Sequence, residues 1–366
     1  MSEKIRVAVI YGGQSTEHSV SCVSAGAVMA HLDRDKYEVV PIGITREGAW
    51  TPGVRSGLEI TDGTLPEVAM GEELTLSLNP AKRGQIHNLT TGALHAEVDV
   101  IFPVLHGPFG EDGTIQGLLE LVGLPYVGPG VLASAAGMDK EFTKKLAMAE
   151  GLPITAEVIL RDGRRELSEA EQHQLGLPVF VKPARGGSSI GISKVNSWED
   201  LGAAVELAYQ HDNKVIVEAE ITGAEVEVGV LEYPDGSLQA SVPAKLNGIE
   251  DSAEGFYGFE TKYLDNVVSA EIPAQLEPAV IAQLQDLAIA SFKACDCKGL
   301  ARVDFFVTDK GPVLNEINTM PGFTPISMFP QVFAKSGVPY GELLDTMLST
   351  ALLNRRGLSN EVAQNH

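Results

Sequence analysis

The sequence predicts an α/β protein in three parts: an open parallel α/β domain, a small central α+β domain and a C-terminal domain with a mixed sheet. Two observations lead to this fold class. An apolar run, Ile5 to Tyr11, enters Gly12-Gly13 and then the helical stretch Ser19 to Leu32, which is the strand-turn-helix start of a parallel sheet. From residue 223 onward strand patterns dominate. A length of 366 residues agrees with two to three domains.

The first part, residues 1–137, contains further apolar strands. Val39 to Ile44 and Val98 to Leu105 indicate strands, and Thr114 to Val122 indicates a helix. Residues 45–96 are polar and punctuated by glycines, which indicates an insertion of short strands and loops. Open α/β sheets bind ligands at the loops that follow the carboxyl ends of their strands. Glu17 and His106 both follow predicted strands, so we expect them to face a ligand.

The residues alone leave two interpretations of Glu17. A carboxylate on this turn can bind a substrate ammonium group. It can also cap the next helix, because Ser15-Thr16-Glu17 precedes the helical stretch and acidic side chains favour a helix start.

The central part, residues 138–222, alternates helices and strands. The expected elements are a helix over Met138 to Glu150, a strand over Val179 to Pro183, a helix over Trp198 to His211 and a strand over Lys214 to Glu218. The small-residue loop Ala184 to Gly191, which includes Ser188, can bring backbone N–H groups close to an anion. Lys140 and Lys182 would add cations for a triphosphate. A flexible linker is the alternative, since the loop matches no established phosphate-binding pattern.

The boundary between the central and C-terminal parts carries a strand end of alternating character, Glu218-Ala219-Glu220-Ile221, followed by Glu225. The backbone of such a hinge could hydrogen-bond an adenine edge, and Glu225 could bind ribose hydroxyls. An ordinary acidic strand end is the competing interpretation.

In the third part, residues 223–366, we expect strands over Ala224 to Leu231 and Ser237 to Pro243 and a helix over Glu277 to Cys295. The glycine- and aromatic-rich segment 248–266 indicates a long loop between them. Loops of this length inside a compact domain are usually functional. This segment is our candidate for a lid over the active site.

The most informative stretch is a predicted hairpin near the end of this part. Val303, Phe305 and Val307 alternate with Arg302, Asp304 and Phe306, and a second alternating run, residues 313–318, follows the turn Asp309-Lys310-Gly311. Asp304, Glu316 and Asn318 can then share one face and offer the oxygen ligands that Mg²⁺ prefers. Two amphipathic strands with a solvated acidic face are the alternative.

Composition bounds the possible partners. Lys and Arg number 27 and Asp and Glu number 49, which gives a formal net charge of −22 and disfavours nucleic acid and anionic membranes. No apolar run has the length of a transmembrane helix, and the first residues do not resemble a signal peptide, so we expect a cytoplasmic protein. Cys22, Cys295 and Cys297 lack metal-ligand spacing and are expected to be reduced thiols.

Taken together, the motifs resemble the D-alanine:D-alanine ligase family of the ATP-grasp superfamily over nearly the whole chain. The motifs that carry the resemblance are residues 12–21 (GGQSTEHSVS), 106–113 (HGPFGEDG), 138–140 (MDK), Lys182-Pro183 with the Gly-Gly-Ser-Ser loop, Lys262-Tyr263, and 315–322 (NEINTMPG).

The resemblance implies a role for each matching residue. Asp304, Glu316 and Asn318 would hold two Mg²⁺ or Mn²⁺ ions, with Glu316 bridging; Lys140, Lys182 and Lys262 would hold ATP phosphates; Glu218, Ala219, Ile221, Glu225 and Phe306 would hold the nucleoside. Glu17 would bind the ammonium of the first D-alanine with His106 nearby, Ser188 and Tyr263 would link with Glu17 across the lid, Ser327 and Met328 would receive the carboxylate of the second D-alanine, and Arg302 and the Gly322 N–H would form the oxyanion hole.

These roles fit the chemistry that the resemblance implies. A carboxylate is a poor electrophile, so it is first phosphorylated by ATP, with metal ions and lysines neutralising the moving charge. An amine then attacks the acyl phosphate, whose tetrahedral oxyanion needs fixed donors such as the permanently charged Arg302. The resemblance further implies a homodimer that serves peptidoglycan precursor synthesis, cell-wall biogenesis and cell shape.

Three other functions remain as alternatives. A D-alanine:D-lactate ligase of the same family generally carries a different lid residue at the position of Tyr263. A nicotinamide-dependent dehydrogenase would need a third glycine that the turn after the first strand lacks, and it leaves the hairpin unexplained. A catalytically silent ATP-binding module is the third, because fold does not fix function.

Overall fold

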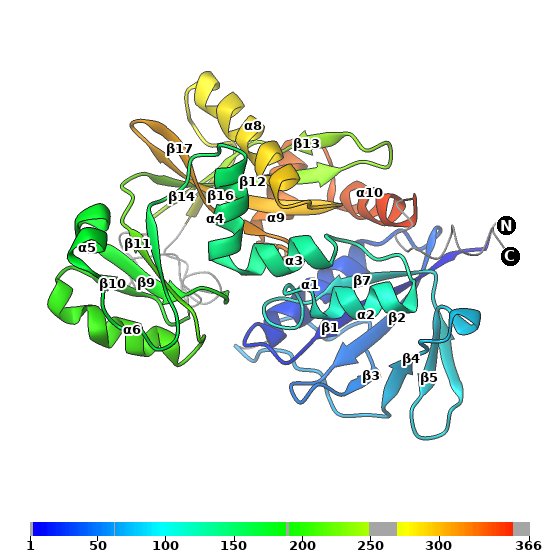
Figure 1. The fold of residues 1–366 in the computed structure, drawn as a ribbon. Helices are drawn as coiled ribbons and strands as arrows, with labels where there is room; N and C mark the ends of the chain where they lie inside the picture. The colour runs from blue at the N-terminus through cyan, green and yellow to red at the C-terminus, as the bar shows by residue number, and fades with distance from the viewer. Residues whose placement is uncertain (1–2, 62, 188–189, 249–268, 354–366) are drawn as a thin grey trace, which may run out of the picture.

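The computed structural model describes residues 3–61, 63–187, 190–248 and 269–353 (Figure 1). The N-terminal part is built on a four-stranded sheet in the order β3-β2-β1-β7. Its elements are β1 (Ile5–Gly12), α1 (His18–His31), β2 (Tyr37–Ile44), β3 (Trp50–Pro52), β7 (Val100–Val104) and α2 (Thr114–Val122). β1 is parallel to both β2 and β7, and β3 is antiparallel to β2. The parallel sheet predicted from the apolar runs is confirmed.

Short elements fill much of the polar stretch 45–96, as its composition predicts. β4 (Leu74–Leu76), β5 (Gln85–Asn88) and β6 (Leu94–Glu97) form a separate antiparallel sheet with the 3₁₀ turn η1 (Pro80–Lys82). Leu74, Leu76 and Ile86 pack against the N-terminal sheet, and no residue of this small sheet lines the cavity described below.

The helix predicted to start at Met138 is wrong at its beginning. Met138 ends a preceding helix, α3 (Val131–Met138), and α4 (Lys140–Ala149) starts after a break at Asp139. Asp139 has an extended backbone, and its carboxylate accepts a hydrogen bond from Phe142 N, so it is the N-cap of α4. Aspartate favours this position because it satisfies an N–H group that the helix itself leaves unpaired.

The central part is an antiparallel sheet in the order β10-β9-β11-β8. Its elements are β8 (Glu157–Leu160), α5 (Glu169–Leu175), β9 (Val179–Pro183), β10 (Ser193–Val195), η2 (Trp198–Asp200), α6 (Leu201–Tyr209) and β11 (Val215–Ala219). The predicted strands before and after the small-residue loop are confirmed as β9 and β11. The helix predicted over residues 198–211 divides into η2 and α6, and β8 and α5 were not predicted.

The C-terminal part is a larger antiparallel sheet, ordered β15-β14-β12-β16-β17, with β13 paired to β12. Its elements are β12 (Ala224–Glu232), β13 (Leu238–Ala240), β14 (Ala244–Asn247), β15 (Ser269–Glu271), α8 (Pro278–Ala294), β16 (Leu300–Thr308), β17 (Gly311–Asn318), α9 (Met328–Lys335) and α10 (Tyr340–Leu353). The strand predicted over residues 237–243 is shorter in the structure: only β13, residues 238–240, pairs with β12, and the next pairing begins with β14. The hairpin of β16 and β17 is confirmed.

One apolar cluster joins the N-terminal sheet to α9 and α10, which explains why these helices lie against the first part in Figure 1. Phe102 of β7 meets Phe323 edge to face with ring centroids 5.7 Å apart, and Phe329 of α9 packs on Phe323. Tyr340 Oη donates to Phe323 O at 2.6 Å. The central sheet has its own core, formed by β8, β9, β11 and α6. Gly322 therefore lies next to a residue fixed in a core shared by the two ends of the chain.

Across the described parts of the chain, no helix is long and apolar enough to cross a membrane. All three cysteines are free and buried, as expected for reduced thiols.

Candidate active site

A cavity of about 360 Å³ lies where the three parts meet. Each candidate residue that the structure describes lines it: Glu17, His106, Lys140, Lys182, Glu218, Ala219, Ile221, Glu225, Arg302, Asp304, Phe306, Glu316, Asn318, Gly322, Ser327 and Met328. Ser188, Lys262 and Tyr263, with residues 249–266 of the expected lid, lie outside the described residues. Candidate residues that are more than 300 positions apart in the sequence therefore line the same cavity.

The hairpin places its polar side chains opposite one another. Asp304 pairs with Glu316 in the strand register, and Arg302 pairs with Asn318. Arg302 donates to both oxygens of Asp304, at 2.8 and 2.7 Å, and Asn318 Nδ2 donates to Asp304 Oδ2 at 3.0 Å. A β-bulge interrupts the pairing between Asp304 and Phe305.

Because of this bulge, the side chains of β17 do not follow the simple alternation that the sequence predicts. Strict period 2 would place Leu314 on the same face as Glu316. Asn315 is instead skipped in the register, so that Leu314 pairs with Phe305 and is buried, like Ile317. One extra residue shifts the face of every side chain beyond it. The bulge is what lets a core residue and the cavity-facing Glu316 lie two positions apart.

Arg302 is held between two carboxylates. Its Nε lies 3.1 Å from Oε2 of Glu227 on β12, and its other ion pair is with Asp304. Burial alone would lower the pKa of Arg302, but Asp304 and Glu227 raise it well above its ordinary value. The guanidinium is therefore fixed in place and permanently charged, as an oxyanion donor needs to be.

Sequence reasoning missed Glu227, which is buried. The signal was the alternation of Glu225 and Glu227 with the apolar Val226 and Val228, which predicts both glutamates on the cavity face of β12.

The donor set fits a divalent cation that is shared with a substrate. Asp304, Glu316 and Asn318 supply hard oxygens, and Mg²⁺ is commonly bound by one or two carboxylates together with phosphates. Within the described residues there is no group of three His, Cys, Asp or Glu side chains that would hold a metal by itself. The described acidic residues of the cavity wall are Glu17, Glu111, Glu218, Glu220, Glu225, Glu227, Asp304 and Glu316, against the basic residues Lys140, Lys182 and Arg302. A polyphosphate entering this acidic space needs added positive charge.

Two lysines face the hairpin from the central part. Lys140 Nζ donates to Gly186 O at 3.0 Å and lies 3.5 Å from Oε2 of Glu316. Lys182 forms an ion pair with Glu218, which also pairs with Lys144 of α4. Burial would raise the pKa of Glu218, but these two lysines lower it to about 2. Lys144 is almost fully buried, and sequence reasoning missed it because a lysine in a helical run is ordinarily solvated.

Glu157 of β8 adds a titratable group at the same lysine. Its Oε2 lies 3.4 Å from Lys144 Nζ. Burial raises the pKa of Glu157 to about 7, and the nearby carboxylates of Glu218 and Glu141 raise it as well, against the lowering effect of Lys144.

We expect Glu157→Gln to flatten the pH dependence of stability between about pH 4.5 and 7. In this window the folded protein holds a proton on Glu157 that the unfolded chain has lost, so wild-type stability falls as pH rises. Glutamine keeps the shape and does not titrate. The difference in Tm, variant minus wild type, should therefore increase from about pH 5 to about pH 7.5. Glu206→Gln, on the exposed surface, is the control. A difference that stays constant with pH would contradict the assignment.

The turn after β1 brings Glu17 to the cavity. Glu17 occupies the N-cap position of α1, as the capping interpretation expects, but its side chain makes no capping hydrogen bond. A Cβ at Gly107 or Gly187 would lie 3.1 or 3.0 Å from Glu17 Oε2. The carboxylate therefore lies beside the loop after β7 and beside the small-residue loop of the central part.

His106 and Glu111 tie the loop after β7 to the segment that follows β17. Nδ1 of His106 is 3.1 Å from Met320 O, and its Nε2 is 3.2 Å from Ser24 Oγ. Glu111 accepts hydrogen bonds from Gly107 N at 2.7 Å and Met320 N at 3.1 Å. Burial, with the charge of Glu17, raises the pKa of Glu111 to about 8, and burial lowers that of His106. Glu111 belongs to the motif at residues 106–113, but the sequence does not show that it bridges to Met320, which lies 209 residues away along the chain.

The segment after β17 ends at the N-terminus of α9. Ser327 is the N-cap residue of α9, Met328 is its first residue, and both line the cavity. A Cβ at Gly322 would lie 2.7 Å from Ser327 Oγ, so this close approach favours glycine. Unpaired N–H groups at a helix N-terminus bind anions such as carboxylates.

The opposite end of the cavity is lined by strand ends and an aromatic ring. Glu218 and Ala219 end β11, and Ile221 lies in the crossing to β12. Glu225 of β12 pairs in register with Phe306 of β16. A wall that combines an aromatic ring and apolar side chains with a few polar groups suits a nucleobase.

Two antiparallel sheets beside one cavity, with Lys182 on one and the carboxylate hairpin on the other, are the arrangement of the ATP-grasp class of protein. Family models described as "D-ala D-ala ligase N-terminus" and "D-ala D-ala ligase C-terminus" match residues 6–129 and 146–349. The chain belongs to the D-alanine–D-alanine ligase family.

Individual relatives agree with this family. The chain is 65% identical to a D-alanine–D-alanine ligase of Corynebacterium aurimucosum over 96% of this chain and 98% of the relative. It is 67% identical to that of Corynebacterium efficiens over 96% and 97%. Among solved structures, the D-alanine-D-alanine ligase from Coxiella burnetii matches with a TM-score of 0.82 and 32% identity, covering 97% of this chain and 95% of that one. The VanG D-Ala:D-Ser ligase from Enterococcus faecalis matches with a TM-score of 0.82 and 34% identity, covering 95% and 100%.

Proposed function

We propose that this protein joins two molecules of D-alanine to D-alanyl-D-alanine, with ATP converted to ADP and phosphate through a D-alanyl phosphate intermediate. The observation that carries the proposal is a single cavity lined by the Glu17 carboxylate, the lysines Lys140 and Lys182, the acidic hairpin and Arg302. Family membership supports the same reaction. The two Corynebacterium relatives, at 65% and 67% identity, are D-alanine–D-alanine ligases, which favours this product over a D-alanyl-D-lactate ester.

In the first step, a carboxylate oxygen of one D-alanine attacks the γ-phosphorus of ATP and ADP leaves. Glu17 binds the ammonium group of this D-alanine, and Lys140 and Lys182 contact the phosphates. Mg²⁺ or Mn²⁺, two ions held by Asp304, Glu316 and Asn318, would supply charge neutralisation on the transferred phosphoryl group. The nucleoside lies against Phe306, beside Glu218, Ala219, Ile221 and Glu225.

In the second step, the amine of the second D-alanine attacks the acyl carbon and phosphate leaves. Arg302 and the Gly322 N–H stabilise the oxyanion, since donors fixed before the reaction need no reorganisation. Ser327 and Met328, at the N-terminus of α9, receive the carboxylate of this second D-alanine. The amine loses a proton in this step, and the phosphate group is our candidate acceptor.

The proposal also includes residues outside the described ranges, the domain boundaries, the oligomeric state and the cellular location. We assign Lys262 to the ATP phosphates, and Ser188 and Tyr263 to a lid that excludes water from the acyl phosphate. We divide the chain at residues 1–137, 138–222 and 223–366. The protein works as a cytoplasmic homodimer in peptidoglycan precursor synthesis, as membership of the family suggests.

The test is to identify products by mass after incubation with ATP and Mg²⁺. D-alanyl-D-alanine should form from D-alanine and not from L-alanine, with one ADP per peptide. Parallel reactions with D-alanine plus D-lactate or D-serine measure the choice of acceptor. Predominant ester or mixed dipeptide would overturn the assigned second substrate. Absence of product and of ADP release would favour a catalytically silent ATP-binding module.

A further inference from the structure

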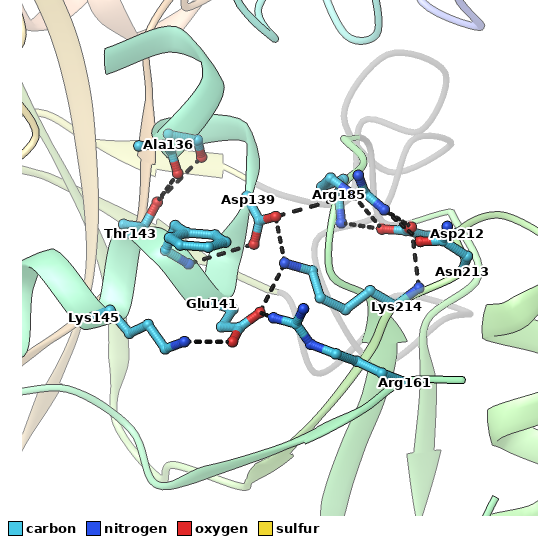
Figure 2. Close-up of polar contacts among 12 residues, drawn as sticks. Ala136, Asp139, Glu141, Thr143, Lys145, Arg161, Arg185, Asp212, Asn213 and Lys214 are labelled. Atoms are coloured by element: carbon cyan, nitrogen blue, oxygen red, sulfur yellow. Dashed lines mark hydrogen bonds and ion pairs between the residues drawn. The ribbon is translucent and has the colours of Figure 1, made fainter. Parts of the chain in front are cut away.

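Lys214 is a buried lysine outside the cavity, and no step of the proposed reaction uses it. Lys214 directly precedes β11, and its side chain points to the N-terminus of α4 (Figure 2). There Nζ forms ion pairs with Asp139 and with Glu141, the latter at 2.8 Å. Only 7% of the Lys214 side chain is exposed, and Asp139 and Glu141 are buried to a similar degree. Charges withdrawn from water in this way are stable only while they remain paired.

The partners of Lys214 flank a residue of the phosphate site. Asp139 and Glu141 are the neighbours of Lys140, whose Nζ faces Glu316 across the cavity. Asp139 is also the cap that starts α4. Thr143 donates to Ala136 O at 2.8 Å across the break between α3 and α4 (Figure 2). Lys214 therefore holds the turn from which the Lys140 side chain departs.

The backbone of Lys214 contacts the small-residue loop as well. Ala184 N donates to Lys214 O, and Lys140 N donates to Ala184 O, both at 2.9 Å. Lys140 Nζ then donates to Gly186 O at 3.0 Å. One short chain of hydrogen bonds thus connects β11, the loop and α4, and the ion pairs of Lys214 close it into a ring.

Arg185 reinforces this ring from the solvent side. It donates to both oxygens of Asp212, with distances of 2.6 to 3.1 Å, and its Nε lies 4.0 Å from Asp139 Oδ2 (Figure 2). About half of the Arg185 side chain is exposed. By contrast the Lys145 side chain is about half exposed, and it pairs at 2.7 Å with Glu141 and not with Asp139.

We propose that Lys214 is a positioning residue for nucleotide binding. Through its ion pairs with Asp139 and Glu141, it holds Lys140 and the loop 184–187 in fixed positions relative to each other. The proposal rests on the proposed function, because it takes Lys140 as a ligand of the ATP phosphates. Lys214 itself touches no substrate. Its loss should act first on the nucleotide, because the residues assigned to the amino acids belong to other elements: Glu17 to the turn before α1, Arg302 to the hairpin, and Ser327 and Met328 to the N-terminus of α9.

The experiment compares Lys214→Met with Lys145→Met, a matched lysine of the same cluster at its exposed rim. Binding of adenylyl imidodiphosphate with Mg²⁺ is measured by calorimetry, and KM and kcat are measured separately for ATP and D-alanine. For Lys214→Met we expect the Kd for the nucleotide and the KM for ATP to rise about tenfold, the scale of coupling within one charged network. The KM for D-alanine should stay near wild type, and Lys214→Arg should recover part of the loss. Lys145→Met should leave all constants near wild type.

Arg185→Gln is a second variant that tests the same network if Lys214→Met does not fold. Arg185 is about half exposed, so its substitution should leave the core intact. It should weaken nucleotide binding in the same direction without a change in Tm. A lowered Tm with unchanged nucleotide affinity in Lys214→Met, or unchanged affinity in Arg185→Gln when Lys214→Met is unfolded, would overturn the proposal. Wild-type protein that fails to bind the nucleotide, or binds it equally well after Lys140→Met, would instead refute the proposed function.

Discussion

Arg302→Met should lower kcat by about 10²–10³-fold, the typical effect of removing one oxyanion donor. Arg302 is clamped between two carboxylates, those of Glu227 and Asp304. Its position is thus set before substrate arrives. Methionine fills much of the same volume but offers neither charge nor donor. Product formation under saturating ATP and D-alanine gives kcat, and nucleotide binding measured separately should persist.

Controls distinguish chemistry from folding. Removal of the guanidinium leaves Glu227 and Asp304 close together, so Arg302→Met is also expected to lower Tm. Arg6→Met is the control, because Arg6 of β1 pairs with Asp99 and with Glu97 of β6, and none of these residues lines the cavity. Arg302→Lys keeps the charge but loses the two-pronged contact and should remain slow. A kcat near wild type in Arg302→Met would remove Arg302 from the oxyanion hole.

Glu316→Gln should weaken the binding of Mg²⁺ and lower kcat by roughly 100-fold or more, since metal neutralisation of a transferring phosphoryl group contributes several kcal/mol. Glu316 faces Asp304 across the hairpin and Lys140 across the cavity. Glutamine keeps the shape and one oxygen but loses the negative charge. Phosphate release, followed against Mg²⁺ concentration, should show a higher half-saturation concentration and a lower plateau.

Glu232→Gln is the matched control for this change. Glu232 is a buried glutamate of the same sheet that accepts a hydrogen bond from Gly299 N at 2.7 Å and does not line the cavity. Its change should affect Tm and leave the Mg²⁺ curve unaltered. If Glu316→Gln gave a Mg²⁺ curve like that of wild type, the hairpin would not be the metal site.

The parts of the fold that were predicted correctly have local signals in the sequence. β1 and α1 follow from an apolar run, two glycines and a helical stretch, and the hairpin follows from alternation on both sides of a turn. α3, β8 and α5 were missed, and α4 was started too early, because a break at one aspartate depends on a capping contact. The bulge at Asn315 was also missed, since it depends on the pairing of two strands.

The sequence by itself determined the chemical inventory: an acidic hairpin, lysines near a glycine loop, Glu17 after the first strand, and the resemblance that links them. Only the tertiary structure decided which charges are buried together. Lys144 and Lys214 look like ordinary surface residues in their local sequence, and no local signal identifies the partners of Glu227 and Glu111. These partners lie 74 to 209 residues away along the chain. A buried charge is stable because of what lies beside it in space, and the spacing of residues along the chain carries no record of that neighbour.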